Sequence, residues 1–86
     1  METVVYWRMP VAFVLINTEI DSMENVLGEL TKIKGIEEAY SLYGTYDIIA
    51  KIEAKSVDEL NDVVSARIRK TFNVKNTLTL ITFGKA

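Results

Sequence analysis

The chain has 86 residues, of which 49% are hydrophobic and 26% charged, and its formal net charge is −2. This length and composition predict one globular domain. The absence of cysteine excludes a disulfide framework. The absence of histidine excludes catalysis or metal binding by histidine. The slight acidic excess also disfavours a nucleic-acid-binding surface.

The sequence shows no signal for export or membrane insertion. No apolar run approaches the roughly 20 residues of a membrane span. The first residues lack the basic region of a signal peptide. We therefore expect a cytoplasmic protein with no membrane partner.

The first half of the chain reads as a strand, a helix and a strand. Residues 11–17, VAFVLIN, form a short apolar run rich in β-formers, which predicts a strand. One apolar stripe at helical spacing follows, made of Met23, Val26, Leu27, Leu30 and Ile33. Residues 36–43 are predicted to form the second strand.

Local signals give the expected ends of the first helix. Asp21 with Glu24 resembles a capping box at its start. Gly35, after Lys34, is the expected stop. Gly28, which is unfavourable inside a helix, is expected to permit close approach of a neighbouring element.

The second half repeats the same order of elements. Residues 46–53 are predicted to form a strand with Ile48, Ala50 and Ile52 on one face. Ser56 and Glu59 form a second capping box. A second apolar stripe at helical spacing follows, made of Val57, Leu60, Val63, Val64 and Ile68. Residues 77–83 are predicted to form the last strand.

This β-α-β-β-α-β order predicts an α+β fold, the ferredoxin-like βαββαβ plait. Right-handed crossovers give a four-stranded antiparallel sheet with both helices on one face. Residues 11–86 are the expected domain, and residues 1–10 an N-terminal extension.

The first predicted strand is apolar on both faces, although two helices can cover only one side of the sheet. The last strand has the same property. An apolar patch in water marks an interaction site, so we expect a second copy to cover the open face in two-fold symmetry. The alternatives are that residues 1–9 fold back over this face or add an intersubunit strand.

A charged residue, Asp47, precedes Ile48 at the start of the third strand. Gly44-Thr45 connects the second and third strands and matches a type II′ turn. The Asp47 carboxylate could accept hydrogen bonds from amides of this turn. Alternatively, it could hold the ammonium group of a small ligand whose carboxylate is bound by the turn amides. The two roles are compatible.

Two sequence patterns, around Gly44-Thr45-Tyr46-Asp47 and in Val74-Lys75-Asn76-Thr77-Leu78-Thr79-Leu80-Ile81, support a family resemblance. Together with Ile36 and Ala39-Tyr40, they make the chain resemble the effector domain of the Lrp/AsnC (feast/famine) transcription regulators, also called the RAM domain. The resemblance spans roughly residues 11–83. It implies plaits that dimerise through their sheets, form octameric or similar rings, and bind amino acids or related effectors between dimers.

The resemblance also implies a ligand site. Its residues are Gly44, Thr45, Tyr46, Asp47, Thr77 and Thr79. The two threonines are equally well explained by β-propensity alone. Since family members normally carry a helix-turn-helix domain, and only ten residues precede the first strand here, the chain resembles the stand-alone effector-domain members. We therefore expect no direct DNA binding, and action through oligomers or full-length Lrp/AsnC regulators.

The order of elements is shared by two other classes of protein. Small plait enzymes of the dimeric, cofactor-independent oxygenase or isomerase type are one alternative. The polar candidates for such chemistry (Asp47, Glu53, Lys51, Tyr40 and Tyr43) form no recognisable nucleophile, base and orienting group. An RNA-recognition module would need stacking aromatics on its central strands, where Phe13 is the lone match. The sequence thus favours a non-catalytic sensing domain without cofactor or metal.

Overall fold

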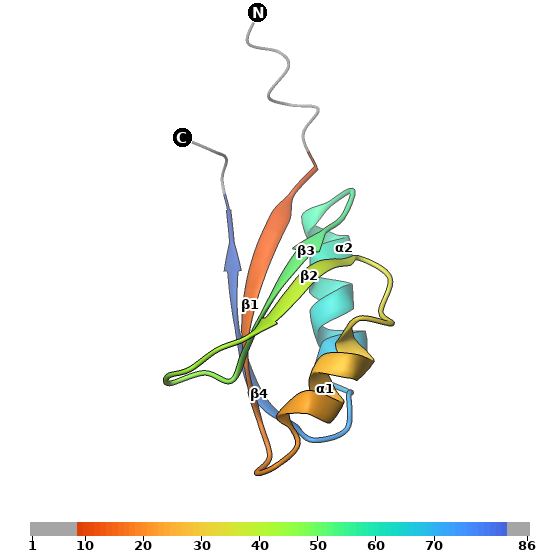
Figure 1. The fold of residues 1–86 in the computed structure, drawn as a ribbon. Coiled ribbons are helices and arrows are strands. Elements are labelled where there is room, and N and C mark those ends of the chain that lie inside the picture. Colours follow the sequence, from red (N-terminus) through yellow and green to blue (C-terminus); the bar gives the residue numbers. More distant parts are fainter. Residues whose placement is uncertain (1–8, 83–86) are drawn as a thin grey trace, which may run out of the picture.

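The computed structural model describes residues 9–82, which form one sheet and a helical layer (Figure 1). The elements in chain order are β1 (Val11–Thr18), α1 (Met23–Leu30), β2 (Ile36–Ser41), β3 (Ile48–Glu53), α2 (Val57–Asp62), η2 (Val63–Ile68) and β4 (Val74–Ile81). The strand order is β2-β3-β1-β4, with every pair antiparallel. The helices cover one face, which confirms the ferredoxin-like plait. Most of the predicted N-terminal extension, residues 1–8, lies outside the described residues.

β1 is one of the two central strands of the sheet, and its side chains alternate between the two faces. Ala12, Val14 and Ile16 are buried under the helices. Phe13 and Leu15 alternate with them on the opposite face and are only half-buried. The strand is therefore apolar on both faces, as its sequence indicated.

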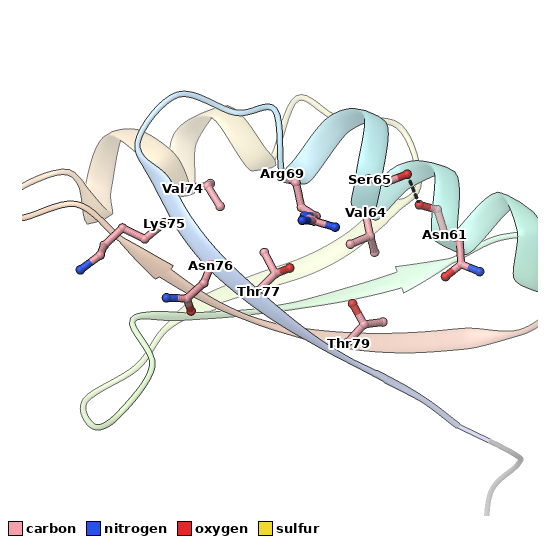
Figure 2. A pocket seen from close by; sticks show the side chains of 9 residues that line it. All are labelled: Asn61, Val64, Ser65, Arg69, Val74, Lys75, Asn76, Thr77 and Thr79. Atoms are coloured by element: carbon pink, nitrogen blue, oxygen red, sulfur yellow. Dashed lines mark hydrogen bonds between the residues drawn. The ribbon is translucent and has the colours of Figure 1, made fainter.

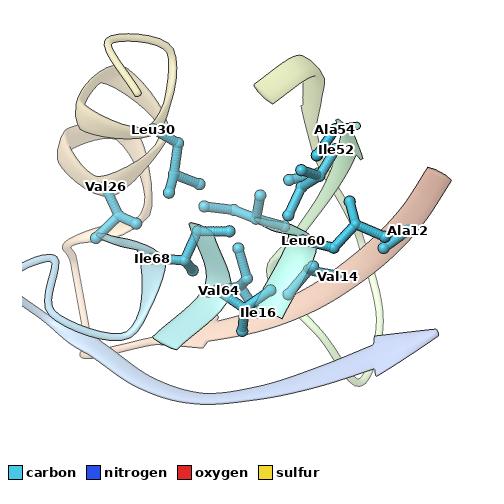
Figure 3. Packing of buried hydrophobic residues seen from close by; sticks show 12 residues of the cluster. Ala12, Val14, Ile16, Val26, Leu30, Ile52, Ala54, Leu60, Val64 and Ile68 are labelled. Atoms are coloured by element: carbon cyan, nitrogen blue, oxygen red, sulfur yellow. The ribbon is translucent and has the colours of Figure 1, made fainter. Parts of the chain in front are cut away.

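The core lies between the sheet and the helices (Figure 3). Its buried residues are Ala12, Val14, Ile16, Val26, Leu30, Ile48, Ala50, Ile52, Ala54, Leu60, Val64 and Ile68. The predicted inward face of β3 is confirmed, since Ile48, Ala50 and Ile52 are all fully buried. No helix within residues 9–82 combines the length and apolar character needed to cross a membrane.

The start of α2 carries the predicted cap. Ser56 Oγ accepts a hydrogen bond from the Glu59 amide at 3.1 Å, and the Glu59 carboxylate accepts one from the Lys55 amide at 3.1 Å. After Asp62 the helix continues as the π-helical segment η2, in which the Arg69 amide bonds to the Val64 carbonyl, five residues back, at 2.8 Å. The spacing of the apolar residues predicted a helix here, but it did not indicate that the segment is a π-helix.

The predicted ends of α1 are wrong. Asp21 has a φ of +63°, and Ser22 takes the N-cap position without a capping side-chain hydrogen bond. A tight turn, closed by the Ser22 amide on the Glu19 carbonyl at 3.1 Å, sets this conformation. Gly35 has a φ of +105° but lies in the connection to β2, because the helix has already ended at Leu30.

The two other glycine predictions also fail. A Cβ added at Gly28 would meet nothing within 4 Å, so no element approaches closely there. Gly44 does not form a two-residue type II′ turn, since the connection from β2 to β3 spans residues 42–47 and Gly44 has no positive φ. The connection is instead closed by the Leu42 amide on the Asp47 carbonyl at 2.8 Å.

Alanine substitutions at Gly28 and Gly35 should change stability in opposite directions. Gly28→Ala adds a good helix former in open space and should stabilise the fold by about 1 kcal/mol. Gly35→Ala forces alanine into a left-handed conformation, 3.3 Å from Val63 Cγ2, and should destabilise it by about 1–2 kcal/mol. Urea unfolding at one fixed protein concentration measures both. Equal effects of the two changes would contradict the assigned backbone conformations.

Candidate functional site

Asp47 fastens the β2–β3 loop to the end of β1. Its Oδ2 accepts hydrogen bonds from the Thr18 amide at 2.8 Å and from Thr18 Oγ1 at 3.1 Å. Its own amide donates to the Ile16 carbonyl at 3.0 Å. The predicted contact with turn amides is therefore wrong, because the longer loop places Asp47 beside β1 instead.

One edge of the Asp47 carboxylate remains available. Within residues 9–82, only Oδ2 accepts hydrogen bonds, and Oδ1 has no donor. The side chain is half-buried, so its charge is only partly screened by water. A carboxylate in this setting can accept further hydrogen bonds from a cationic ligand group.

The loop that carries Gly44, Thr45 and Tyr46 projects beyond the sheet (Figure 1). Gly44 and Thr45 are exposed and Tyr46 is half-buried. The backbone amides of residues 43–46 donate no hydrogen bond to any other part of residues 9–82. The loop thus offers free N–H donors next to the Asp47 carboxylate.

Thr77 and Thr79 lie in a different place. Both are half-buried on the helix-covered side of β4, the edge strand. Ile16 of β1 pairs with Ile48 of β3 on one side and with Thr77 on the other. Since neighbouring strands lie about 5 Å apart, β1 separates the threonines from the Asp47 loop by about 10 Å. Within one protomer the structure does not unite the two groups of predicted site residues.

The threonines line a groove of about 620 Å³ between the second helix and β4 (Figure 2). Asn61, Ser65 and Arg69 form its helical wall, and Ser65 Oγ donates to the Asn61 carbonyl at 2.8 Å. These three residues were not predicted from the sequence. Their spacing of four would have placed them on one helix face, but only the topology brings that face beside Thr77 and Thr79.

The sheet face opposite the helices is lined with apolar side chains. One row across all four strands consists of Tyr40, Ile49, Leu15 and Leu78. In the next row Phe13 stands beside Leu80. The exposed fractions of Leu78 and Leu80 are 44% and 50%. We call these apolar side chains (Phe13, Leu15, Tyr40, Ile49, Leu78 and Leu80) the open face.

Polar groups on the β2 side of this face form a small network. The Tyr40 hydroxyl donates to the Glu38 carboxylate, and Lys51 Nζ lies 3.9 Å from Glu38 Oε2. The hydrogen bond to Glu38 and the negative charge of this carboxylate raise the pKa of Tyr40 above its ordinary value. Tyr40 and Lys51 are thus both directed to Glu38.

The polar residues weighed for catalysis do not converge on one point. Tyr40 and Lys51 contact Glu38, whereas Asp47 is bonded to Thr18. Tyr43 is fully exposed on the β2–β3 loop. Residues 9–82 also contain no group of three or more acidic side chains placed to share a metal ion.

The comparisons with known proteins identify the family of the chain. Residues 11–85 match the family described as the Lrp/AsnC ligand binding domain. The chain belongs to this family, which confirms the resemblance derived from the Gly44–Asp47 and Val74–Ile81 segments.

Two curated relatives contain a similar segment within longer chains. An uncharacterised HTH-type transcriptional regulator from Pyrococcus furiosus is 32% identical over 75 residues, covering 84% of this chain and 50% of the regulator. A homocitrate synthase from Saccharolobus solfataricus is 36% identical over 74 residues, covering 83% of this chain and 16% of the enzyme. The chain thus spans half the length of the regulator and a much smaller part of the enzyme.

Solved structures share the fold along most of the chain. A Thermus thermophilus protein is 33% identical with a TM-score of 0.86, and the match covers 91% of this chain and 98% of that one. A feast or famine regulatory protein from Mycobacterium tuberculosis, complexed with L-methionine, is 26% identical with a TM-score of 0.77. The match covers 99% of this chain and 57% of the M. tuberculosis protein. These likenesses place the chain among regulatory effector domains.

Removing the Asp47 carboxylate should weaken the fold. In Asp47→Ala the partly buried Thr18 amide loses its charged acceptor, which should cost about 1.5–3 kcal/mol in the free energy of unfolding. The matched control is Glu37→Ala, an exposed carboxylate on β2, which should stay within about 0.5 kcal/mol. Equal unfolding free energies of the two variants would show that the bonds to Thr18 contribute no stability.

Proposed function

We propose that this domain is a cytoplasmic, non-catalytic sensor of an amino acid or related metabolite, which couples ligand binding to oligomerisation in transcriptional regulation. The observation that carries the proposal is the half-buried Asp47 carboxylate, with one oxygen lacking a donor within residues 9–82, beside free loop amides. The domain makes no direct contact with DNA and acts through oligomers or through full-length Lrp/AsnC regulators.

The ligand class follows from the paired chemistry of the loop. The Asp47 carboxylate accepts hydrogen bonds from an ammonium group, and the amides of Gly44, Thr45 and Tyr46 donate to a carboxylate. An amino acid carries both groups on one carbon. The M. tuberculosis relative complexed with L-methionine supports the same ligand class.

A complete site requires more than one protomer. Thr77 and Thr79 are separated from the loop by β1, too far for one small amino acid to touch both groups in the same subunit. We place the site at a subunit junction, where a neighbouring copy supplies its threonines to the loop. A ligand shared in this way favours whichever assembly completes its site.

The open face supports a dimer formed through the sheet. Leu78 and Leu80 are about half exposed in the protomer, next to Leu15 and Phe13. A second copy presents the same surface, so a two-fold axis brings one apolar face against another. Residues 1–9 remain the alternative cover, and eight of them lie outside the described residues.

A second apolar surface supports assembly of dimers into a ring. Ile20 and Phe72 have exposed fractions of 89% and 85%. Their loops are adjacent, since the Glu19 amide donates to the Asn73 carbonyl at 2.9 Å. These two loops lie at one end of the protomer (Figure 1), so we propose that dimers meet there through this surface.

A second candidate function is control of a metabolic enzyme. The 36% identity to a segment of homocitrate synthase shows that a chain of this type also occurs within an enzyme. The ligand site would be the same, and only the partner that responds to the ligand would differ.

Asp47→Asn should weaken ligand binding while leaving the fold intact. The amide oxygen can still accept from Thr18, but the charge that attracts an ammonium group is lost, so affinity should fall by about tenfold or more. Isothermal titration calorimetry with each of the twenty amino acids measures the effect, with Glu37→Gln as the charge-matched control. Unchanged affinity in Asp47→Asn would remove Asp47 from the site.

Leu80→Glu should separate the sheet-to-sheet dimer. A carboxylate within the apolar contact is costly to bury, so light scattering should report a lower mass than for the wild type. Val57→Glu is the control, because Val57 has a similar exposed fraction, 45%, on α2. The dimer proposal fails if both variants keep the wild-type mass while remaining folded.

A further inference from the structure

The groove between the helix formed by α2 and η2 and β4 has the chemistry of an anion-binding site. We propose that it binds the oxyanion end, carboxylate or phosphate, of a small metabolite, with Arg69 as the anchoring residue. The groove shares Thr77 and Thr79 with the proposed amino acid site, but Arg69, Ser65 and Asn61 have no part in that site and make the groove a binding site within one protomer.

The cation in the groove is available for a ligand. The Arg69 guanidinium has five donors and no acceptor, and it makes no ion pair or side-chain hydrogen bond within residues 9–82. Figure 2 shows its side chain between the helix and β4, above the strand that carries Thr77 and Thr79. A planar guanidinium matches carboxylate and phosphate groups in bidentate geometry.

Hydroxyl groups face Arg69 from the opposite wall. The hydroxyls of Thr77 and Thr79 form no hydrogen bond within residues 9–82, so each has a free proton to donate to an oxyanion. Ser65 lies on the same helical wall as Arg69 and is held by its bond to the Asn61 carbonyl. Arg69 and the threonines thus provide charged and neutral donors from two sides.

The charges of the lining residues favour a negatively charged ligand. Among residues 9–82, the groove is lined by Arg69 and Lys75 and by no aspartate or glutamate, although the whole chain has a net charge of −2. The Lys75 ammonium group points away from Arg69 (Figure 2), so it adds positive potential without direct contact. Among residues 9–82 of one protomer, a ligand ammonium group would find no carboxylate in this groove, in contrast to the Asp47 loop.

The shape of the groove suits a small organic molecule. Its volume of about 620 Å³ is within the range of small-molecule sites. Val64 and Val74 supply apolar surface for the carbon skeleton of a ligand. The helical wall is also the π-helical segment, marked by the bond from the Arg69 amide to the Val64 carbonyl, and π turns occur frequently at functional sites.

Methyl-detected NMR on the full chain tests the proposal. The methyl groups of Val64 and Val74 report on the groove during separate titrations with sodium phosphate and sodium succinate, at ionic strength held constant with sodium chloride. We expect saturable shifts with at least one probe. Arg69→Gln should weaken the binding about tenfold or more, because the charged donors are lost.

Arg67→Gln is the matched control. Arg67 is an exposed arginine of the same helix that does not line this groove, and its replacement should change the affinity by no more than about twofold. Saturation with phosphate, succinate or both supports the site and identifies the anionic group. Shifts that do not saturate with either probe, or an equal loss in both arginine variants, would overturn it.

The groove and the amino acid site can be tested separately although they share Thr77 and Thr79. Asp47→Asn should retain the shifts of Val64 and Val74, because Arg69 and both threonines belong to one protomer, in which Asp47 lies on the other side of β1. Loss of these shifts in Asp47→Asn would contradict a groove site that binds anions without the Asp47 loop. If calorimetry detects no amino acid binding while phosphate or succinate still binds in the groove, only the sensor proposal is refuted.

Discussion

β1 carries apolar side chains on both faces, while the helices cover only one of them. Ala12, Val14 and Ile16 complete the core, whereas Phe13 and Leu15 are left with the leucines of β4 on the open side. Burying half of β1 is what stabilises the protomer, since apolar burial is the main favourable term in folding. The other half leaves an apolar surface that water solvates poorly, and this imbalance underlies the proposed assembly.

The central position of β1 also organises the polar chemistry. Thr18 at its end holds the Asp47 carboxylate, and on its other side Val14 and Ile16 pair with Thr79 and Thr77. One side therefore presents an acceptor for cations and the other a groove whose charged lining residues are cations. The ammonium group of an amino acid and the oxyanion of a second metabolite would thus bind on opposite sides of one strand.

The regular elements could be predicted from the sequence because their signals are local. The alternation of Ile48, Ala50 and Ile52 is consistent with only one buried face, and the Ser56–Glu59 cap forms as expected. The capping-box prediction failed at Asp21. A turn closed by the Ser22 amide on the Glu19 carbonyl gives Asp21 a left-handed backbone conformation, which is incompatible with the N-cap position of a capping box. Helix propensity and capping patterns are weak predictors of helix ends wherever the connection between two elements determines the backbone geometry.

The candidate sites were less predictable because they depend on contacts between distant segments. The importance of Asp47 could be inferred from a charge at the start of an apolar strand, but its partner, Thr18, is 29 positions away in the chain. In sequence, Asn61, Ser65 and Arg69 are typical of a solvent-exposed helix face. They become a groove wall only because β4 runs beside that face as the edge strand.

Isotope-filtered NOE spectroscopy on a mixture of labelled and unlabelled chains tests the central claim most directly. If two copies meet through the sheet, the labelled Leu78 and Leu80 methyl groups should show NOEs to protons of the unlabelled chain. If these methyl groups show NOEs only within their own chain, for example to residues 1–9, then the open face is covered without a partner. That result would contradict the dimer and the effector site that depends on it.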